Sequence, residues 1–186
     1  MKLVTVIIYS CWLASEVLLG RLKRAGAGDQ KRADNNSLLS IWIVIACSTT
    51  LAATLSNIIP MAIAHNSSIR YAGLALIVLG MSMRFIVIRS LGRFFTVDVA
   101  IREGHQLKTD GFYAVIRHPS YLASWLSFVG FGISLNNWIS LGIVAVSVMG
   151  VFLYRISIEE RVLIVQFGET YLHYKKKTKA IIPMVY

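Results

Sequence analysis

The sequence predicts an all-α integral membrane protein, a bundle of about five transmembrane helices with a cytoplasmic connecting segment and a C-terminal helix. Hydrophobic residues make up 56% of the chain and mean hydropathy is +0.63. Charged residues make up only 15%, whereas soluble domains carry about 25%. Five apolar stretches approach the roughly 20 residues that a membrane-spanning helix needs. The basic residues, which give a net charge of +10, cluster in alternate connections between these stretches.

The five apolar stretches are, in chain order, 3–20, 39–64, 71–89, 121–135 and 138–154. Asn57 and Pro60 lie near the end of the second stretch, where a proline predicts a kink. The last two stretches are short, and Asn136-Asn137 between them predicts a tight turn. We therefore expect a helical hairpin that barely crosses a bilayer.

The distribution of basic residues predicts the orientation. Sixteen of the 19 Lys and Arg residues lie in 21–38, in 89–117 and from 155 onward. Five crossings place these three segments on one side, and the N-terminus, 65–70 and the Asn-Asn turn on the other. The positive-inside rule makes the basic side cytoplasmic and the N-terminus external.

Residues 102–121, REGHQLKTDGFYAVIRHPSY, form the first cluster of chemically active side chains. Pro119 suits the first turn of the helix that follows, where its missing N–H costs nothing. Arg117 and His118 then lie at the start of that helix, where an anion is bound well. The alternative is that Arg117 only contacts lipid headgroups and His118 only caps the helix.

Residues 155–174, RISIEERVLIVQFGETYLHY, form the second cluster. Arg155 and Glu159 are four residues apart and share a helix face. Glu159 and Glu160 are adjacent carboxylates at the predicted membrane border, where they need a cation, from Arg155, from Arg161 or from a ligand. The alternative is a surface salt bridge. Apolar residues on one side of the segment predict a helix lying against the bundle.

Several classes of function are disfavoured. No aromatic platform accompanies the basic charge, which argues against nucleic-acid binding. No His-x-x-x-His or paired-Cys spacing is present, so no metal is expected. Cys11 and Cys47 are expected to be small buried hydrophobes. Glu16 is expected to pair structurally with Arg21, one turn away.

The two clusters resemble a known family. HQLKTDGFYAVIRHPSYLASW at 105–125 and RISIEERVLIVQFGETYLHYKKKTKAIIP at 155–183 are similar to the isoprenylcysteine carboxyl methyltransferase family, within a wider group of membrane methyltransferases that includes phospholipid N-methyltransferases. The shared pattern is Arg117-His118-Pro119, a helical hairpin, and then Glu159-Glu160. The resemblance covers roughly residues 80–183.

The resemblance implies that S-adenosylmethionine binds at the cytoplasmic face and leaves as S-adenosylhomocysteine. It implies catalytic roles for Arg155 and Glu159, with Arg155 also contacting the substrate. The cofactor-binding residues that it implies are His105, Gln106, Leu107, Lys108, Tyr113, Arg117, His118, Pro119, Ser120, Tyr121, Glu159 and Glu160. Many members have Gly where this chain has Ala123, whose methyl group is expected to narrow that part of the pocket.

The predicted activity is carboxyl O-methylation of an isoprenylcysteine-like or other lipophilic or prenylated small substrate in the lipid bilayer. The alternatives are a phospholipid or amine N-methyltransferase and, more remotely, a membrane reductase or a non-enzymatic membrane protein. Residues 1–186 are expected to form one domain, in which 1–89 form the N-terminal transmembrane helices and 90–186, with the hairpin 121–154, form the cofactor-binding catalytic region. The short chain and compact loops suggest a multi-pass protein of a prokaryotic inner membrane.

Overall fold

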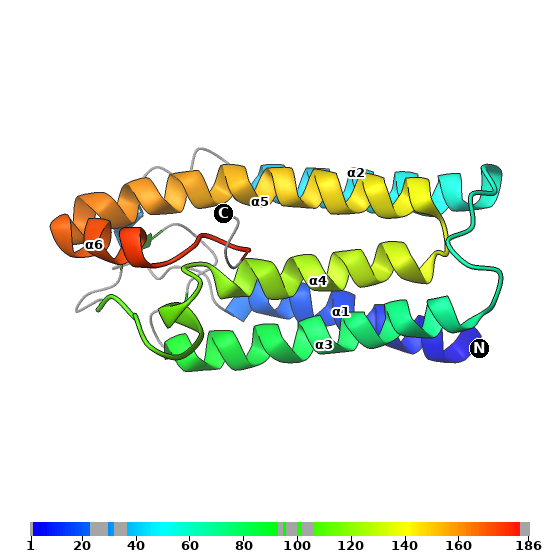
Figure 1. Ribbon diagram of the computed structural model, residues 1–186, viewed down its shortest axis with the longest axis horizontal. Coiled ribbons are helices and arrows are strands. Elements are labelled where there is room, and N and C mark those ends of the chain that lie inside the picture. Colours follow the sequence, from blue (N-terminus) through cyan, green and yellow to red (C-terminus); the bar gives the residue numbers. More distant parts are fainter. Residues whose placement is uncertain are drawn as a thin grey trace.

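The protein is a bundle of long helices with a short helix folded back at one end (Figure 1). The computed structural model describes residues 2–22, 30–31, 37–92, 95, 100–101 and 106–182. The elements are α1 (Lys2–Leu22), β1 (Gln30–Lys31), α2 (Ser37–Ile58), α3 (Ser68–Leu91), β2 (Ala100–Ile101), the 3₁₀ helix η2 (Gly111–Ala114), α4 (Pro119–Ser134), α5 (Trp138–Phe167) and α6 (Glu169–Lys177). The two short strands pair antiparallel, with Gln30 opposite Ile101. The predicted all-α class is confirmed.

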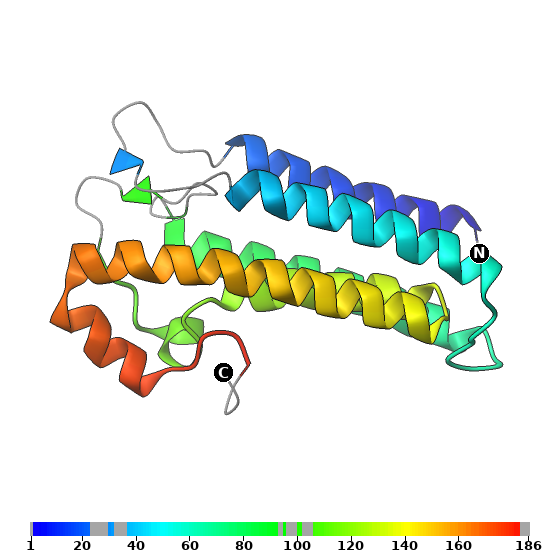
Figure 2. The same cartoon turned by 90° about the horizontal axis from the view of Figure 1, so that it is seen from above.

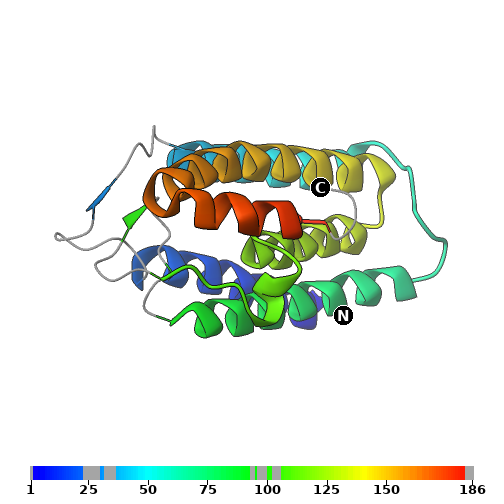
Figure 3. The same ribbon diagram turned by 60° about the vertical axis from the view of Figure 1, so that its left-hand side comes forward.

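The helices α1 to α5 run side by side along the long axis of the molecule. Figure 3 shows α1 with α3 on one side of the bundle and α2 with α5 on the other, with α4 between the two pairs. The helix α4 packs against both α3 and α5, and it therefore joins the two halves.

Within the described residues, three helices are long and apolar enough to cross a membrane: α2, α3 and α5. An apolar stretch of α1, Leu3–Leu19, is shorter, and α4 has 16 residues. At 1.5 Å per residue α4 is about 24 Å long, slightly less than the hydrocarbon core. The bounds of α1, α3 and α4 follow the predicted stretches closely, whereas α2 ends at Ile58 instead of continuing to 64. Pro60 therefore ends this helix and does not kink it, because the residue before a proline avoids the helical conformation.

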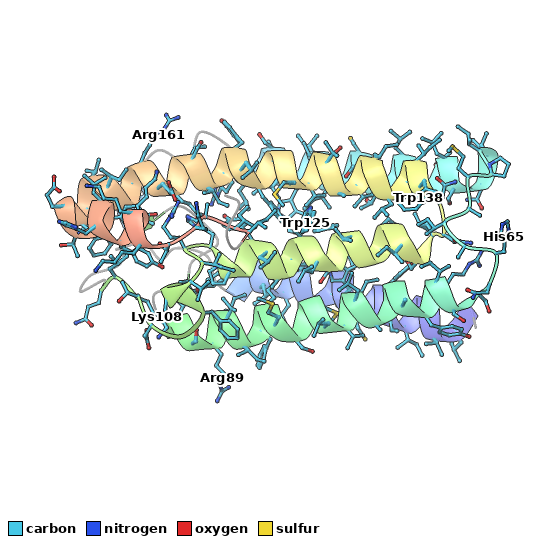
Figure 4. All side chains as sticks on the ribbon, viewed as in Figure 1. His65, Arg89, Lys108, Trp125, Trp138 and Arg161 are labelled. Atoms are coloured by element: carbon cyan, nitrogen blue, oxygen red, sulfur yellow. The ribbon has the colours of Figure 1, made fainter. Side chains whose placement is uncertain are left out.

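The connections separate into two ends as predicted. The N-terminus, residues 59–67 and the Asn136-Asn137 turn lie at one end of the bundle, and α6 and η2 lie at the other (Figure 1). In the side-chain view, His65 and Trp138 mark the first end, whereas Lys108, Arg89 and Arg161 lie toward the second (Figure 4).

The Asn-Asn turn is fixed by hydrogen bonds to the opposite loop. Asn136 adopts a positive φ of 54°, and its side chain accepts from the backbone of Ile63 and Ala64. Asn137 caps α5 by accepting from the N–H of Ser140 at 3.0 Å. The predicted tight turn is confirmed.

The second helix of the hairpin does not end at 154. The helix α5 continues without a break to Phe167, so Arg155, Glu159 and Glu160 lie on the spanning helix itself. The predicted end of this helix at 154 is therefore wrong. The chain reverses only at Gly168, which has a positive φ of 53°, and α6 then returns alongside the end of α5 (Figure 2).

The tightest helix contact joins α3 and α4 through small residues. A Cβ built on Gly130 would lie 2.7 Å from the carbonyl oxygen of Gly73 and 2.8 Å from the backbone nitrogen of Ile77. A Cβ on Gly80 would similarly meet the backbone of Ala123 and Ser127. Close backbone approach through small residues is the usual basis of helix packing in membranes.

The apolar core lies between the five long helices, α1 to α5. Trp12 packs against Phe128 and Phe131, with ring centroids 4.8 and 5.9 Å apart. Cys11 and Cys47 are exposed, so the expectation that they are buried is wrong. In a bilayer an apolar side chain is as well placed facing lipid as facing the core, and hydrophobicity alone does not distinguish the two positions.

Candidate active site

A cavity of about 730 Å³ runs along the inside of the bundle. The helix α2 lines it from Leu38 to Asn57, a length of about 28 Å at 1.5 Å per residue. At the end of the bundle near α6, charged and aromatic residues of α4, α5 and α6 form its wall. Farther in, the wall is mainly apolar, with side chains such as Trp12, Phe128 and Phe131.

The first turn of α4 is held in place by the end of the chain. The backbone N–H groups of Arg117 and His118 donate to the carbonyls of Lys179 and Ala180 at 2.8 and 3.0 Å. The backbone N–H of Lys179 donates in return to the carbonyl of Val115 at 3.2 Å. Pro119 occupies the first turn of α4, as predicted. His118 precedes it as the N-cap residue but makes no side-chain cap, so the alternative that it only caps the helix is wrong.

Glu159 is the centre of the polar end of the cavity. Its carboxylate accepts a short hydrogen bond from the hydroxyl of Tyr121. It also lies 3.5 Å from Nδ1 of His118 and 3.4 Å from Nε of Arg155. The predicted pairing of Arg155 with Glu159 on one helix face is confirmed. Arg155 is fully buried and also donates to Oγ of Ser37, at the start of α2.

Glu160 faces a different set of partners. Its Oε1 accepts from Nε of Arg117 at 2.8 Å, and its Oε2 accepts from Nζ of Lys175. Successive residues on an α-helix point about 100° apart. Glu159 therefore lines the cavity whereas Glu160, which is also buried, is not among the lining residues.

Three tyrosines complete the polar end. Tyr113 of η2 and Tyr171 and Tyr174 of α6 all line the cavity. Tyr174 donates to the carbonyl of Tyr113 at 2.6 Å. Burial raises the pKa of Tyr174 to about 12 and raises the pKa of Tyr113 and of Tyr171 well above the ordinary value. All three hydroxyls are therefore protonated at neutral pH.

His118 is poised between two carboxylates. Burial alone lowers its pKa, but Glu159 and Glu160 raise the pKa by more, and the net direction is upward. Its Nε2 lies 3.5 Å from Oε1 of Glu160. The imidazole is therefore biased toward its charged form.

A second ion pair lies on the opposite wall of the cavity. Glu16 of α1 is 3.2 Å from Arg84 of α3, and both side chains line the cavity. Arg84 also donates to the carbonyl of Ser120 in the first turn of α4 at 3.0 Å. The expected pairing of Glu16 with Arg21 involves a side chain outside the described residues and stays a prediction.

Comparison with known proteins places the chain in a family. Residues 73–165 match the model of the isoprenylcysteine carboxyl methyltransferase (ICMT) family. The chain belongs to this family. The matched residues include the first turn of α4, Arg155 and Glu159.

Similar proteins carry the corresponding name. The chain is 39% identical over 115 residues to protein-S-isoprenylcysteine O-methyltransferase B of Arabidopsis thaliana, an alignment covering 61% of this chain and 58% of that protein. It is 33% identical over 146 residues to the protein-S-isoprenylcysteine O-methyltransferase of Homo sapiens, covering 77% and 51%. The chain thus spans between about half and three-fifths of these relatives.

The ICMT fold is also seen in a solved structure. The eukaryotic intramembrane Ras methyltransferase ICMT superposes with a TM-score of 0.62 at 24% identity, covering 97% of this chain and 63% of that one. Together with the long apolar helices, family membership makes the protein an integral, multi-pass membrane protein.

Most of the predicted site residues of this ICMT family member lie together. The predicted residues that line the cavity are Leu107, Lys108, Tyr113, Arg117, His118, Pro119, Ser120, Tyr121, Arg155 and Glu159. Gln106 is exposed and is not among the lining residues. His105 lies outside the described residues. Ala123 is buried in the contact with α3 and is not among the lining residues either. The individual roles of all these residues stay predictions.

The cavity residues that the sequence reasoning missed include two charged side chains, Glu16 and Arg84, and two tyrosines, Tyr171 and Tyr174. A usable signal existed for the first two, because charged residues inside an apolar span face a cavity or the bundle interior. For the tyrosines, the spacing of three residues on a helix places both on one face.

Proposed function

We propose that the protein is a membrane-embedded methyltransferase that uses S-adenosylmethionine to methylate the carboxylate of a lipophilic substrate of the isoprenylcysteine type. The observation that carries the proposal is one continuous cavity, which joins a charged and aromatic end to a long, mainly apolar interior. A water-borne methyl donor needs the polar end, and a membrane-borne acceptor needs the apolar interior. The two environments must adjoin for the methyl group to be transferred. They meet at Glu159 and Arg155.

The polar end fits the methyl donor. One buried atom of a cavity-lining residue, Oη of Tyr171, makes no hydrogen bond within the described part of the chain. It is available to a ligand. The carboxylate of Glu159 suits an ammonium group, and the rings of Tyr113 and Tyr174 suit an adenine or a cation. When bound, S-adenosylmethionine supplies an electrophilic methyl group.

The acceptor needs little chemical activation. A carboxylate is ionised and nucleophilic at neutral pH, so no general base is required. The work of the chain is therefore to orient the reactants and exclude water. Arg155 lines the cavity one turn before Glu159, and a guanidinium binds a carboxylate through two parallel hydrogen bonds. The catalytic region of the predicted domain, 90–186, supplies these groups.

The apolar interior suits the hydrocarbon part of the acceptor. Because α1 packs on α3 and α2 packs on α5, the cavity-lining faces of α1 and α2 belong to opposite halves of the bundle. A lipid-soluble substrate would enter sideways between these two helices. We further infer that the end carrying α6 faces the cytoplasm, since basic residues gather there. A prokaryotic inner membrane stays a prediction.

The test uses the full chain purified in lipid nanodiscs. Isothermal titration should detect binding of S-adenosylhomocysteine, and Glu159→Gln should abolish it. The matched control is Glu169→Gln, because Glu169 is an exposed glutamate on α6. Absence of binding to the wild type would overturn the proposal.

A second assay separates ester from amine products. The wild type is given methyl-labelled donor and an S-prenylated cysteine derivative. Volatile label released by alkali identifies a methyl ester, as proposed. Label that resists alkali identifies an N-methyl product and would reassign the protein to amine or phospholipid methylation.

A further inference from the structure

We propose that Glu160 is a positioning residue that fastens α6 and residues 178–181 over the polar end of the cavity by acting through Arg117 and Lys175. The two adjacent glutamates then have different tasks. Glu159 contacts the ligand, whereas Glu160 fixes the position of α6 in the wall of the cavity. The inference rests on the proposed function for its binding assay.

The position of Glu160 favours this role. Its side chain is 9% exposed, and it is not among the cavity-lining residues. Both of its oxygens are bonded to cations from other elements, one to Arg117 and one to Lys175. A buried carboxylate with two such partners holds its elements together through charge-assisted hydrogen bonds.

Arg117 links Glu160 to the end of α6. With Nε held by Glu160, its Nη1 donates to the carbonyl of Lys175 at 3.2 Å and to that of Thr178. Carbonyls at the end of a helix have no partner within the helix, and a basic side chain often supplies one. Glu160 thereby sets the direction of the arginine that caps α6.

The segment after α6 is also held against the rest of the protein. Residues 179 and 180 bond to the backbone of 115–118, and Ala180 and Ile181 pack with Ile156 of α5. The helix α6 has nine residues, and an isolated helix of this length is not stable in water. Its place therefore depends on such contacts.

The helix held in this way carries part of the site. Tyr171 and Tyr174 project from α6 into the cavity wall, and Gly168, with its positive φ, joins α6 to α5. If the clasp formed by Glu160, Arg117 and Lys175 is weakened, the two tyrosines lose their fixed position. The expected result is weaker binding of the methyl donor with the reacting groups still present.

The test compares Glu160→Gln and Lys175→Met with Lys176→Met, the neighbouring exposed lysine on the same helix. In nanodiscs, the dissociation constant of S-adenosylhomocysteine should rise about tenfold or more in Glu160→Gln, which loses two charge-assisted bonds. It should rise about threefold in Lys175→Met, because the Lys175 side chain is itself 43% exposed and solvent weakens its bond to Glu160. It should stay within about twofold in Lys176→Met. The KM for the donor should rise in parallel, while kcat at saturating donor stays within about threefold.

The double variant distinguishes a clasp from a direct contact. Because both residues act in one cluster, Glu160→Gln/Lys175→Met should be little worse than Glu160→Gln alone. Additive losses, or an unchanged dissociation constant in Lys175→Met, would overturn the inference. A lower thermal stability with unchanged KM for the donor would also overturn it, since that result indicates a role in folding alone.

Hydrogen exchange supplies a readout that does not depend on the proposed activity. Amides of 169–181 should exchange faster in Glu160→Gln and Lys175→Met than in the wild type and Lys176→Met. Equal exchange in all four proteins would refute the clasp. If the wild type binds no S-adenosylhomocysteine, the proposed function fails, and the exchange experiment still tests the clasp.

Discussion

Replacing Gly130 with alanine should separate the two most closely packed helices of the bundle. The new Cβ would lie 2.7 Å from the carbonyl oxygen of Gly73 and 2.8 Å from the nitrogen of Ile77, and ordinary contacts begin at 3.4 Å. The opposing atoms belong to the backbone of α3, so they cannot rotate away. The helices must move apart by about 0.7 Å, and such overpacking typically costs about 1–3 kcal/mol.

Gly142 provides the matched control. It also lies inside a helix, α5, but a Cβ placed there meets nothing within 4 Å. Gly142→Ala should therefore be neutral or slightly stabilising, by about 0.5–1 kcal/mol, because alanine is the better helix former.

The assay is thermal unfolding of the full chain in nanodiscs, followed by intrinsic fluorescence. We expect Gly130→Ala to melt below the wild type and Gly142→Ala to melt at or above it. The reasoning is refuted if Gly130→Ala is as stable as Gly142→Ala. That outcome would mean that α3 and α4 do not touch through these backbones.

Further predictions concern the charged groups of the cavity. Arg155→Ala should lower kcat at least tenfold and leave S-adenosylhomocysteine binding largely unchanged, as measured by turnover and titration. Equal loss of binding in Arg155→Ala, Glu159→Ala and His118→Ala would contradict separate roles for Arg155 toward the substrate and for the other two toward the methyl donor. Because the folded protein raises the pKa of His118, its contribution to stability is complete below the ordinary value of about 6.5 and is lost as pH rises through the higher folded value. Melting temperature should therefore fall from pH 6.5 to 9, and it should fall less in His118→Gln. Glu16→Gln leaves Arg84 without its carboxylate and should lower the unfolding free energy by about 1–3 kcal/mol, whereas an unchanged melting temperature would show that the pair is not formed.

The helices were predictable because hydropathy is a direct measure of what the bilayer selects. Its limits appear where the chain leaves the apolar region. The predicted end at 154 preceded Arg155, Glu159 and Glu160, where hydropathy falls although the residues still favour a helix. The other wrong bound is the end of α2. Hydropathy stays high up to residue 64, but the helix ends at Ile58, two residues before Pro60.

Without the family resemblance, the contacts of the site were predictable only within one helix. Arg155 and Glu159 are four residues apart, and a helix brings them together without further information. The pairing of Glu16 with Arg84 joins α1 to α3, and it depends on which faces of two helices meet. The different directions of Glu159 and Glu160 likewise depend on α6, whose place against α5 no local pattern specifies.

The bond from Arg117 to Thr178 joins positions 61 residues apart, and this spacing orders events during synthesis. The five long helices are all made before the residues that complete the polar wall. A chain ending at Phe167 would keep these helices but lack Tyr171, Tyr174 and the segment whose carbonyls bond to Arg117 and His118. Completion of the pocket therefore waits until residues 169–181 have been made, and such a shortened chain would serve as a reference protein without the wall formed by α6.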